Sequence, residues 1–395
     1  MSLTMKCCTD VGGTFTDCLV LDDAGQVHAF KSPTTPADPT VGMTNVLQKA
    51  ARHFRMELPE FMSNVRLLIA HGTTLSTNAL LTGKIAKIGL LTTKGFRDTL
   101  EMRRGFKNIR TSRFNVFVPP YKPLVPRTLR LPVEERMLHT GEVLTPLNEE
   151  DIYAAIRKFI EEKVEAVAIC FLHSYVNPAH EKRALEICQR ELNGVYITAS
   201  HEVLPVYREY ERFSTTAVSA AVGPITAHYL RSLQQKLREI GFKGTLYMVS
   251  GGGLVQSVDE SARRAASLIN SGPAAAPSGA IRLGQTVGAK NLFSVDMGGT
   301  SYDVCLIHDG EVPATDYNWV GDERVAMKMV DVPSVGAGGG SLAWIDTLGL
   351  LRVGPQSAGA DPGPACYGRG GTQPAVTDAD LILGYVPADY FLGGE

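Results

Sequence analysis

The pattern of hydrophobic and polar positions predicts strands and helices that alternate along most of the chain. Short apolar runs of strand length recur, and stretches with one apolar face at helical spacing lie between them. We expect strands at 65–70, 85–92, 133–138, 166–172, 195–199 and 244–249, and helices at 38–54, 95–102, 148–163 and 178–192. Such alternation is typical of an α/β layer fold.

Proline interrupts this regularity at two places. Prolines recur over 115–132, so we expect an extended segment there rather than a packed element. A helix is expected over 206–221, then a break at Gly223-Pro224 and a second helix over 225–240, which makes this helical pair a candidate hinge. Because 395 residues exceed one core, we predict a first domain at 1–205, a helical connection at 206–240 and a second domain at 241–395.

Composition narrows the class of protein. With 44% hydrophobic residues, 20% charged residues and a formal net charge of -2, the chain has the make-up of an ordinary globular protein. This charge balance provides no basic field for nucleic acid or for an anionic membrane surface, and no apolar run approaches the ~20 residues that span a bilayer. The seven cysteines lie mostly in apolar stretches without metal-ligand spacing, which favours buried thiols and a cytoplasmic location.

One short motif occurs twice. The stretch Asp10-Val11-Gly12-Gly13-Thr14-Phe15-Thr16-Asp17 has an echo at 296–303, Asp-Met-Gly-Gly-Thr-Ser-Tyr-Asp, and an apolar strand flanks each copy. Glycines let the backbone approach a ligand, their N–H groups can contact phosphate oxygens, and an Asp at a strand end can hold Mg²⁺ beside a nucleotide. One copy alone would be read as a tight turn. Two copies in matching contexts favour a pair of phosphate-binding hairpins.

Several stretches together resemble the hydantoinase A and 5-oxoprolinase family, within the superfamily of actin, sugar kinases and heat-shock chaperones. They are 10–17, 71–80, 171–181, 296–303 and 354–368. The resemblance implies an α/β fold in which two ribonuclease-H-like (actin-like ATPase) domains flank a nucleotide cleft. Members of the family are longer and carry an adenosine-binding element beyond the position that corresponds to residue 395. The second domain is therefore expected to be incomplete at its C-terminus.

The resemblance also implies a function. ATP, with Mg²⁺, would phosphorylate the carbonyl oxygen of a cyclic amide such as a hydantoin or 5-oxoproline, and ring-opening hydrolysis would follow with a second, hydantoinase B-like subunit or domain. An amide carbon is a poor electrophile, and phosphorylation of its oxygen makes it reactive towards water. The phosphoryl transfer itself needs mainly positioning and charge neutralisation. Alternatives are the ATP-using subunit of an acetone- or acetophenone-type carboxylase with a ketone substrate, a kinase that releases a stable product, and an ATP-driven activator or chaperone-like switch.

Individual roles follow from this resemblance. Asp10 and Asp296 would bind the metal and carry the catalysis, and Asp10 would also orient the attacking substrate oxygen. Asp17 and Asp303 would support them or be ordinary polar strand residues. The residues expected to hold the nucleotide are Gly12, Gly13, Thr14, Thr16, Gly298, Gly299, Thr300, Gly338 and Gly339. The last two belong to the run 336–341, which also fits a simple turn.

Substrate contacts are expected outside the two hairpins and the glycine run. His71, Thr73, Thr74 and Asn78 surround a junction between a strand and a helix, where hydroxyls outnumber what an N-cap needs. Arg103 could bind a substrate carboxylate or phosphate bidentately, although a solvated helix end explains it equally well.

Three histidines at 173, 180 and 201 lie in separate segments without ligand spacing. A structural role is therefore expected for them rather than a metal site.

Overall fold

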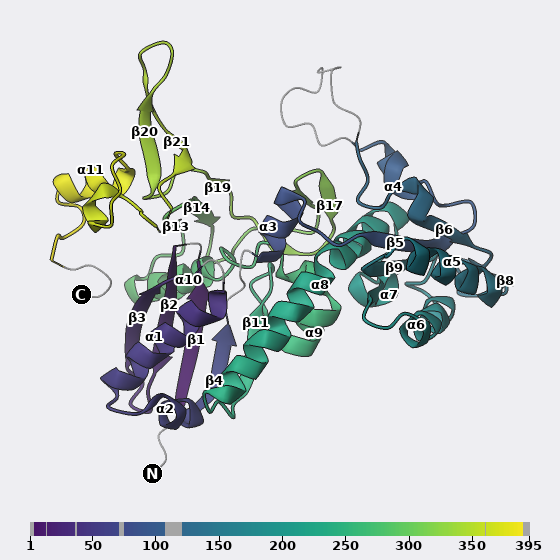
Figure 1. Cartoon of the computed structure of the whole chain (residues 1–395), viewed down its shortest axis with the longest axis horizontal. Helices are drawn as coiled ribbons and strands as arrows, with labels where there is room; N and C mark the ends of the chain where they lie inside the picture. Colours follow the sequence, from purple (N-terminus) through teal and green to yellow (C-terminus); the bar gives the residue numbers. More distant parts are fainter. Residues whose placement is uncertain are drawn as a thin grey trace.

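The computed structural model describes residues 4–12, 14–35, 38–70, 75–106, 121–359 and 361–389. It is a mixed α/β structure in which two larger sheets are joined by one long helix, and smaller sheets follow towards the C-terminus (Figure 1).

The first larger sheet begins with an antiparallel meander and continues with parallel strands. Its order in the described chain is β12-β11-β4-β1-β2-β3, and β4 and β11 run parallel to β1. Side chains of β1 alternate between buried and more exposed positions, as one covered face requires. The strands are β1 (Met5–Val11), β2 (Phe15–Leu21), β3 (Val27–Pro33), β4 (Val65–Ala70), β11 (Thr245–Val249) and β12 (Val255–Ser257).

Two helices near the N-terminus pack on this sheet. They are α1 (Pro39–His53) and α2 (Leu58–Asn64), and α1 begins where the Asp38 carboxylate accepts a hydrogen bond from Thr40 N at 3.0 Å. Leu47 of α1 and Phe61 of α2 are fully buried with Leu68 of β4 in one hydrophobic cluster. The predicted helix 38–54 is confirmed.

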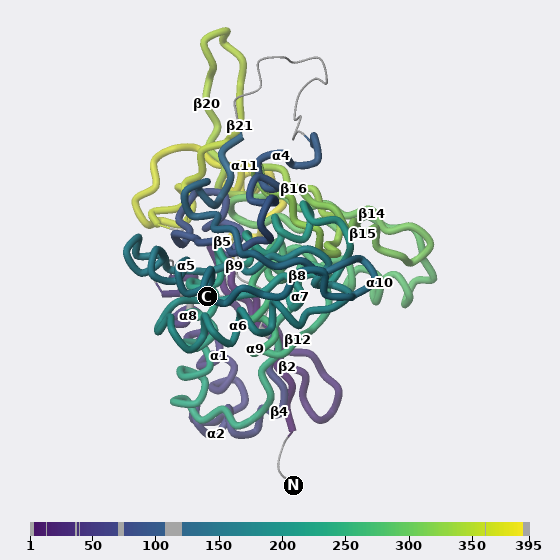
Figure 2. The backbone as a smooth tube through the Cα atoms, turned by 90° about the vertical axis from the view of Figure 1, so that its right-hand side faces the viewer, coloured from purple at the N-terminus to yellow at the C-terminus, as the bar shows by residue number. Residues whose placement is uncertain are grey.

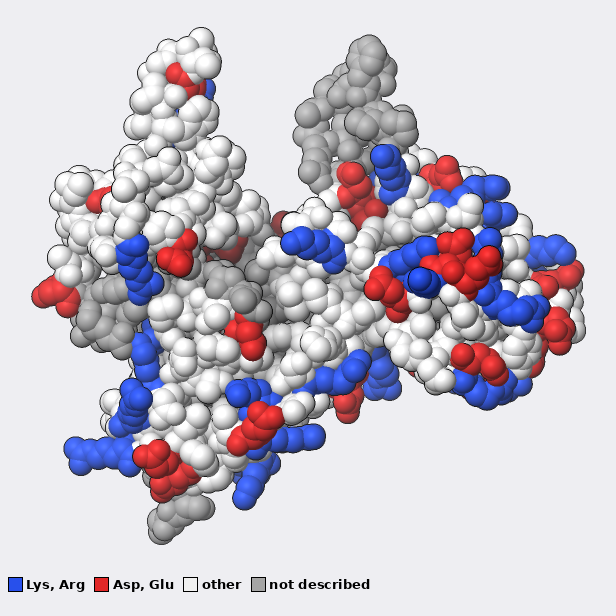
Figure 3. Space-filling view, viewed as in Figure 1, with Lys and Arg blue, Asp and Glu red and all other residues white. Residues whose placement is uncertain are grey.

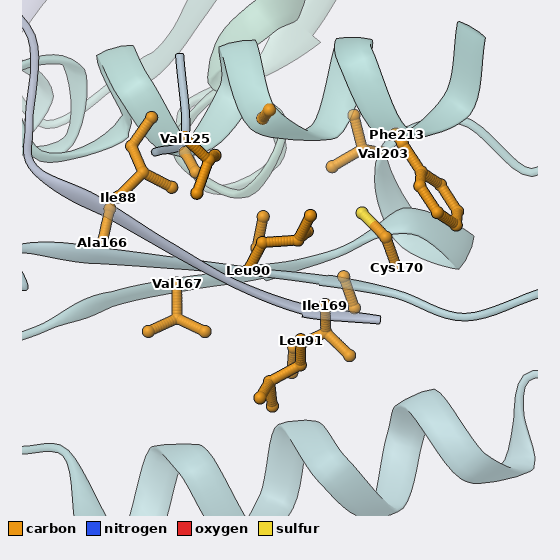
Figure 4. Close-up of a cluster of buried hydrophobic side chains, with 14 of the residues drawn as sticks. Ile88, Leu90, Leu91, Val125, Ala166, Val167, Ile169, Cys170, Val203 and Phe213 are labelled. Carbon is orange, nitrogen blue, oxygen red and sulfur yellow. The ribbon is translucent and has the colours of Figure 1, made fainter. Parts of the chain in front are cut away.

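The second larger sheet is inserted between β4 and β11 in the chain, and we call it the inserted layer. Its strands run parallel in the order β10-β9-β5-β6. Side chains of β5 and β9 are packed between helices on both faces (Figure 4), and every residue of these two strands is buried. The strands are β5 (Ile88–Thr93), β6 (Arg130–Val133), β9 (Ala166–Cys170) and β10 (Tyr196–Ala199).

The elements around this sheet include α3 (Leu75–Thr82), α4 (Thr99–Met102), α5 (Glu149–Glu161), α6 (Ala179–Glu191), α7 (Ser200–Val203), and the small pair β7 (Arg136–Met137) and β8 (Val143–Thr145). The helix predicted at 148–163 is present as α5, and Asn148 caps it by accepting a hydrogen bond from Glu150 N at 3.1 Å. The extended segment predicted for 115–132 is wrong at its end, since Arg130 already begins β6. Pro132 is tolerated there because β6 is an edge strand.

A single helix, α8 (Glu209–Glu239), replaces the predicted helical pair. The break expected at Gly223-Pro224 is wrong, because tertiary packing holds the helix together across the proline. The Ala221 carbonyl, one turn before Pro224, accepts a hydrogen bond from Ala86 N at 3.0 Å. Gly223 leaves room for the Tyr196 ring, which a Cβ would overlap.

The remaining elements form smaller sheets and helices. β13 (Leu292–Met297), β14 (Tyr302–Ile307) and β19 (Ser334–Val335) make a described sheet of three strands, packed by α10 (Ala276–Val287). The hairpin of β20 (Ser341–Ile345) and β21 (Leu351–Ser357) projects from the body in both views (Figure 1, Figure 2). Other elements are α9 (Val258–Arg263), β15 (Ala314–Thr315), β16 (Asn318–Val320), β17 (Glu323–Val325), β18 (Met329–Val330), η4 (Ala365–Tyr367) and α11 (Val376–Ile382).

The strand pairing does not follow the order of the chain. β11 and β12 follow residue 240, yet β11 hydrogen-bonds with β4 in the first sheet, and strands β5, β6, β9 and β10 form the separate inserted layer. On the face in Figure 3, acidic and basic side chains are interspersed over the inserted layer, whereas the surface around β20 and β21 is mostly uncharged. No helix in the described ranges combines the length and apolar character that a membrane crossing requires.

Candidate active site at the paired hairpins

The first copy of the repeated motif is a tight β-hairpin between β1 and β2. Asp10 and Asp17 are direct cross-strand partners, so the two carboxylates of the motif belong to one rung of the ladder. Gly12 N donates to Phe15 O at 2.9 Å, and a Cβ on Gly12 would lie 3.1 Å from that oxygen. The glycine therefore allows the close turn that the motif needs.

The second copy folds in the same way between β13 and β14. Asp296 and Asp303 are cross-strand partners, and Gly298 N donates to Ser301 O at 3.0 Å. The repeated sequence is thus a repeated structure, as the pattern predicted.

The tips of the two hairpins meet. Thr14 is buried, and its side chain occupies the place where a Cβ on Gly299 would lie. Both hairpins open onto one pocket of about 440 Å³. The carboxylates of Asp10, Asp17, Asp296 and Asp303 line it, and so do Gly12, Gly298, Gly299 and Thr300. Gly13 lies outside the described residues.

Burial and like charge make the pocket electrostatically unusual. Burial and the neighbouring carboxylates of Asp17 and Asp296 raise the pKa of Asp10 to about 7. Burial, Asp303 and Asp17 also raise the pKa of Asp296. A carboxyl group that titrates near neutral pH can both accept and donate a proton at physiological pH.

Lys31 is the one cationic side chain among the described residues that line this pocket. Its Nζ lies 2.7 Å from Asp17 Oδ1 and 5.0 Å from the centre of the Phe15 ring, and its charge lowers the pKa of Asp10. Lys31 lies outside both copies of the motif, so the motif alone does not identify it. The signal was available, because the alternating stretch 26–31 pairs with β2 and places Lys31 directly opposite Asp17.

The carboxylates suit a magnesium ion that arrives with a nucleotide. Among the described residues, no three acidic, His or Cys side chains converge in a way that would hold a metal by themselves. Mg²⁺ commonly takes only one or two carboxylates and completes its shell with phosphate oxygens and water. A cation beside Asp10 and Asp296 would also relieve the like-charge repulsion that raises their pKa values.

The glycine run 336–341 reinforces the second hairpin. Gly339 N donates to Gly298 O at 2.9 Å and Gly340 N donates to Gly299 O at 2.7 Å. A Cβ on Gly338 would lie 2.6 Å from both Gly298 O and Thr300 N. Gly339 lines the pocket, whereas Gly338 brings the two backbones together.

The other predicted nucleotide and substrate residues lie in different settings. Thr16 is buried, and its Oγ1 lies 2.9 Å from Thr34 Oγ1, which fixes β2 to the end of β3. Asn78 is on α3 and is not among the pocket-lining residues. His71, Thr73 and Thr74 lie outside the described residues.

Arg103 lies in an aromatic cluster rather than in the hairpin pocket. Its guanidinium carbon is 4.0 Å from the centre of the Tyr121 ring and 4.9 Å from that of Trp319, and its Nε donates to Tyr210 Oη at 3.3 Å. Nearby, Tyr121 Oη donates to Glu323 Oε2 at 2.6 Å, and burial raises the pKa of Glu323 to about 7. Arg103 is buried, so the solvated helix end considered from the sequence is wrong. Its substrate role stays a prediction.

Two of the three histidines pair with buried glutamates in the inserted layer. His180 Nδ1 lies 2.8 Å from Glu135 Oε2, and His201 Nδ1 lies 2.8 Å from Glu181 Oε2. Glu181 also accepts from Phe171 N at 2.7 Å and from His201 N at 2.8 Å, so it ties the end of β9 to α7, the short helix after β10. These contacts fit the structural role expected for the histidines.

Fold and site define a mixed α/β protein built around two matching Asp-x-Gly-Gly-Thr hairpins that share an acidic pocket. The chain belongs to the hydantoinase/oxoprolinase family. Residues 6–192 match the family's N-terminal region, and residues 212–395 match the part described as hydantoinase/oxoprolinase.

Similar proteins cover nearly all of this chain. The caprolactamase subunit alpha of Pseudomonas jessenii is 42% identical over 98% of this chain and 55% of its own length. The acetophenone carboxylase gamma subunit of Aromatoleum aromaticum is 37% identical over 98% and 54%. The nucleotide-free structure of acetone carboxylase, from a study of ATP-dependent carboxylation, has a TM-score of 0.82 at 29% identity and covers 100% of this chain and 56% of that one. The ATP-dependent caprolactamase structure has a TM-score of 0.81 at 40% identity, over 99% and 56%. The chain thus spans about half the length of these relatives.

Proposed function

We propose that this chain is the ATP-using part of an enzyme that opens a cyclic amide. The observation that carries the proposal is the shared pocket, in which the Asp10 and Asp296 hairpins present glycine backbone and carboxylates together. Of the two rings expected from the sequence, a hydantoin and the lactam 5-oxoproline, the similarity to caprolactamase subunit alpha supports a lactam.

In this proposal the hairpins belong to two ribonuclease-H-like domains on either side of a nucleotide cleft. The meander β1–β3 with parallel β4 and β11 is the first domain, and the β13–β14 hairpin begins the second. The inserted layer is an elaboration of the first domain. This division assigns β11 and β12 to the first domain because of their pairing with β4.

The glycine tips would hold the phosphates of ATP. The backbone N–H of Gly299 and the hydroxyls of Thr14 and Thr300 are the groups suited to phosphate oxygens. The N–H groups of Gly12 and Gly298 are already used inside the two turns, so these glycines would serve by letting the backbone come close to the phosphates. Asp10 and Asp296 would hold Mg²⁺, which neutralises phosphate charge when it is bound.

The carbonyl oxygen of the ring attacks the γ-phosphorus. The bond from this phosphorus to ADP breaks, a bond to the carbonyl oxygen forms, and the ring N–H proton passes to the Asp10 carboxylate. Without a metal the pKa of Asp10 is raised to about 7, and bound Mg²⁺ would lower it, so Asp10 would be ionised at neutral pH and able to accept this proton. Lys31 would offset negative charge beside Asp17.

Ring opening is assigned to a partner subunit. One water adds to the activated carbon, the C–N bond breaks to free the amine, and a second water releases phosphate from the acyl phosphate. The relatives are themselves named as subunits, which supports a partner for this chain. A cytoplasmic location remains part of the proposal.

The test is ADP release by the full-length subunit with its partner, in the presence of lactams, hydantoins, or ketones with bicarbonate. Lactam-dependent ADP release together with the ring-opened amino acid is the expected result. ADP release that depends on a ketone and bicarbonate would replace the proposal with a carboxylase, which the acetophenone and acetone carboxylase similarities favour as the second candidate. Phosphorylated product that accumulates would indicate a kinase.

A further inference from the structure

An aromatic pair closes one part of the hairpin pocket. The ring of Phe15, directly after the first hairpin tip, meets the ring of Tyr367 edge-on, with 6.4 Å between the ring centroids and an interplanar angle of 60°. Both residues line the pocket together with Asp10. They come from positions 15 and 367, so only the folded chain brings them together.

Tyr367 is held in place by hydrogen bonds that lead back to the second hairpin. Thr377 N and Thr377 Oγ1, at the start of α11, each donate to Gly339 O at 2.8 Å, and Gly339 N donates to Gly298 O. The Asp378 carboxylate then accepts from Cys366 N at 2.7 Å and from Ala375 N at 2.8 Å, which fixes η4 on the first turn of α11. Tyr367 is therefore positioned relative to both hairpins.

The pair differs chemically from the polar part of the lining. That part presents aspartates and glycine backbone, which suit phosphates and a cation, whereas the pair belongs with the apolar lining residues Val11, Pro273, Met297 and Val386. Two aromatic rings have little to offer a phosphate, but they suit methylene groups. The edge-on arrangement also lacks the parallel slot in which a purine is sandwiched, and Lys31 Nζ lies over the Phe15 ring.

We propose that Phe15 and Tyr367 form the wall against which the methylene ring of the acceptor packs, so that this pair sets the preferred ring size. The inference rests on the proposed function. A lactam has one polar edge, formed by its C=O and N–H groups, and an apolar remainder. With the methylenes on the wall, the polar edge is left to face the carboxylate of Asp10, which lines the same pocket.

The test uses the full-length subunit with its partner and measures ADP release with five-, six- and seven-membered lactams and with varied ATP. Tyr367→Ala should raise KM for the preferred lactam roughly tenfold and change the order of preference among ring sizes, while KM for ATP stays the same. Tyr367→Phe, which keeps the ring, should retain the wild-type order. Phe15→Leu tests the other half of the wall and should weaken discrimination in the same direction.

Tyr385→Ala is the matched control, because this exposed tyrosine lies in the same C-terminal segment but does not line the pocket. An unchanged lactam KM and ring-size order in Tyr367→Ala and Phe15→Leu would overturn the wall while leaving the proposed function intact. A raised KM for ATP alone would reassign the pair to the nucleotide and equally overturn it. Wild-type protein that releases no ADP with any lactam would remove the proposed function and this inference together.

Discussion

The Thr14 side chain of the first hairpin lies against Gly299 of the second, at the place where a Cβ would overlap the Thr14 hydroxyl. Two segments nearly 300 residues apart in the chain thus touch through a threonine and a glycine. Position 299 therefore has to be glycine for this contact to form, in addition to any need for its backbone to come close to a ligand.

Gly299→Ala should therefore destabilise the protein, because its Cβ would overlap the Thr14 side chain. The loss of stability should be smaller in a protein that already carries Thr14→Ala. We expect a lower urea midpoint for Gly299→Ala, with a cost on the order of 1 kcal/mol, and a smaller loss when it is added to Thr14→Ala. A double-mutant cycle measured by urea unfolding checks this. Equal losses in both backgrounds would show that the contact does not form.

Asp10→Asn should abolish ATP turnover and yet stabilise the protein. Because the pKa of Asp10 is raised to about 7 from 3.8, the folded state holds a proton that the unfolded state has lost between these pH values. The free energy of unfolding of the wild type consequently falls as the pH rises through this window. At pH 8 the variant should be more stable by on the order of 1 kcal/mol, and at pH 3 the two proteins should be alike. Thermal unfolding at both pH values is the measurement.

The pH dependence of activity should follow the same carboxyl group. If ionised Asp10 accepts the ring proton, kcat/KM rises with pH to a plateau, and the midpoint lies below 7 because bound Mg²⁺ lowers the raised pKa of Asp10. Asp17→Asn removes a repulsion and should move the midpoint to lower pH, whereas Lys31→Met removes an attraction and should move it to higher pH. Shifts in the same direction for both variants would contradict the proposed role of Asp10.

Substitution by alanine should change the stability of the protein in opposite directions at two helical glycines. Gly223 of α8 lies against the Tyr196 ring, so Gly223→Ala should cost about 1–3 kcal/mol. Gly279 of α10 has open space at its Cβ position, so Gly279→Ala should stabilise by up to about 1 kcal/mol. Chemical unfolding of both variants provides the comparison, with Gly279→Ala as the control for helix propensity.

Arg103→Lys should separate a packing role from substrate binding. A lysine keeps the charge but loses the planar group that lies over Tyr121 and Trp319, so we expect lower stability by about 1–2 kcal/mol with an unchanged KM for the substrate. A higher KM at full stability would instead restore the substrate role predicted from the sequence.

Features that depend on neighbours in sequence were predictable, and features that depend on distant pairing were less so. The hairpins at 10–17 and 296–303 follow from local turn chemistry, and the helix predicted at 148–163 follows from its local apolar pattern. Tyr367 could not be placed, because its position depends on bonds between α11, the glycine run and the second hairpin. Proline rules mispredicted α8, because the buried contacts of Ala221 and Gly223 outweigh the bond that Pro224 cannot make.

The continuous helix α8 has a mechanical consequence. Its 31 residues make a rod of about 46 Å at 1.5 Å per residue. Phe213 near one end is buried in the core of the inserted layer, and Leu233 near the other end is buried in the core of the first sheet. Because both ends of α8 are buried in a core, a tilt of one core moves the whole helix and with it the other core. Pressure applied to the inserted layer by a bound partner would therefore reach the sheet that carries Asp10 as a rigid-body rotation.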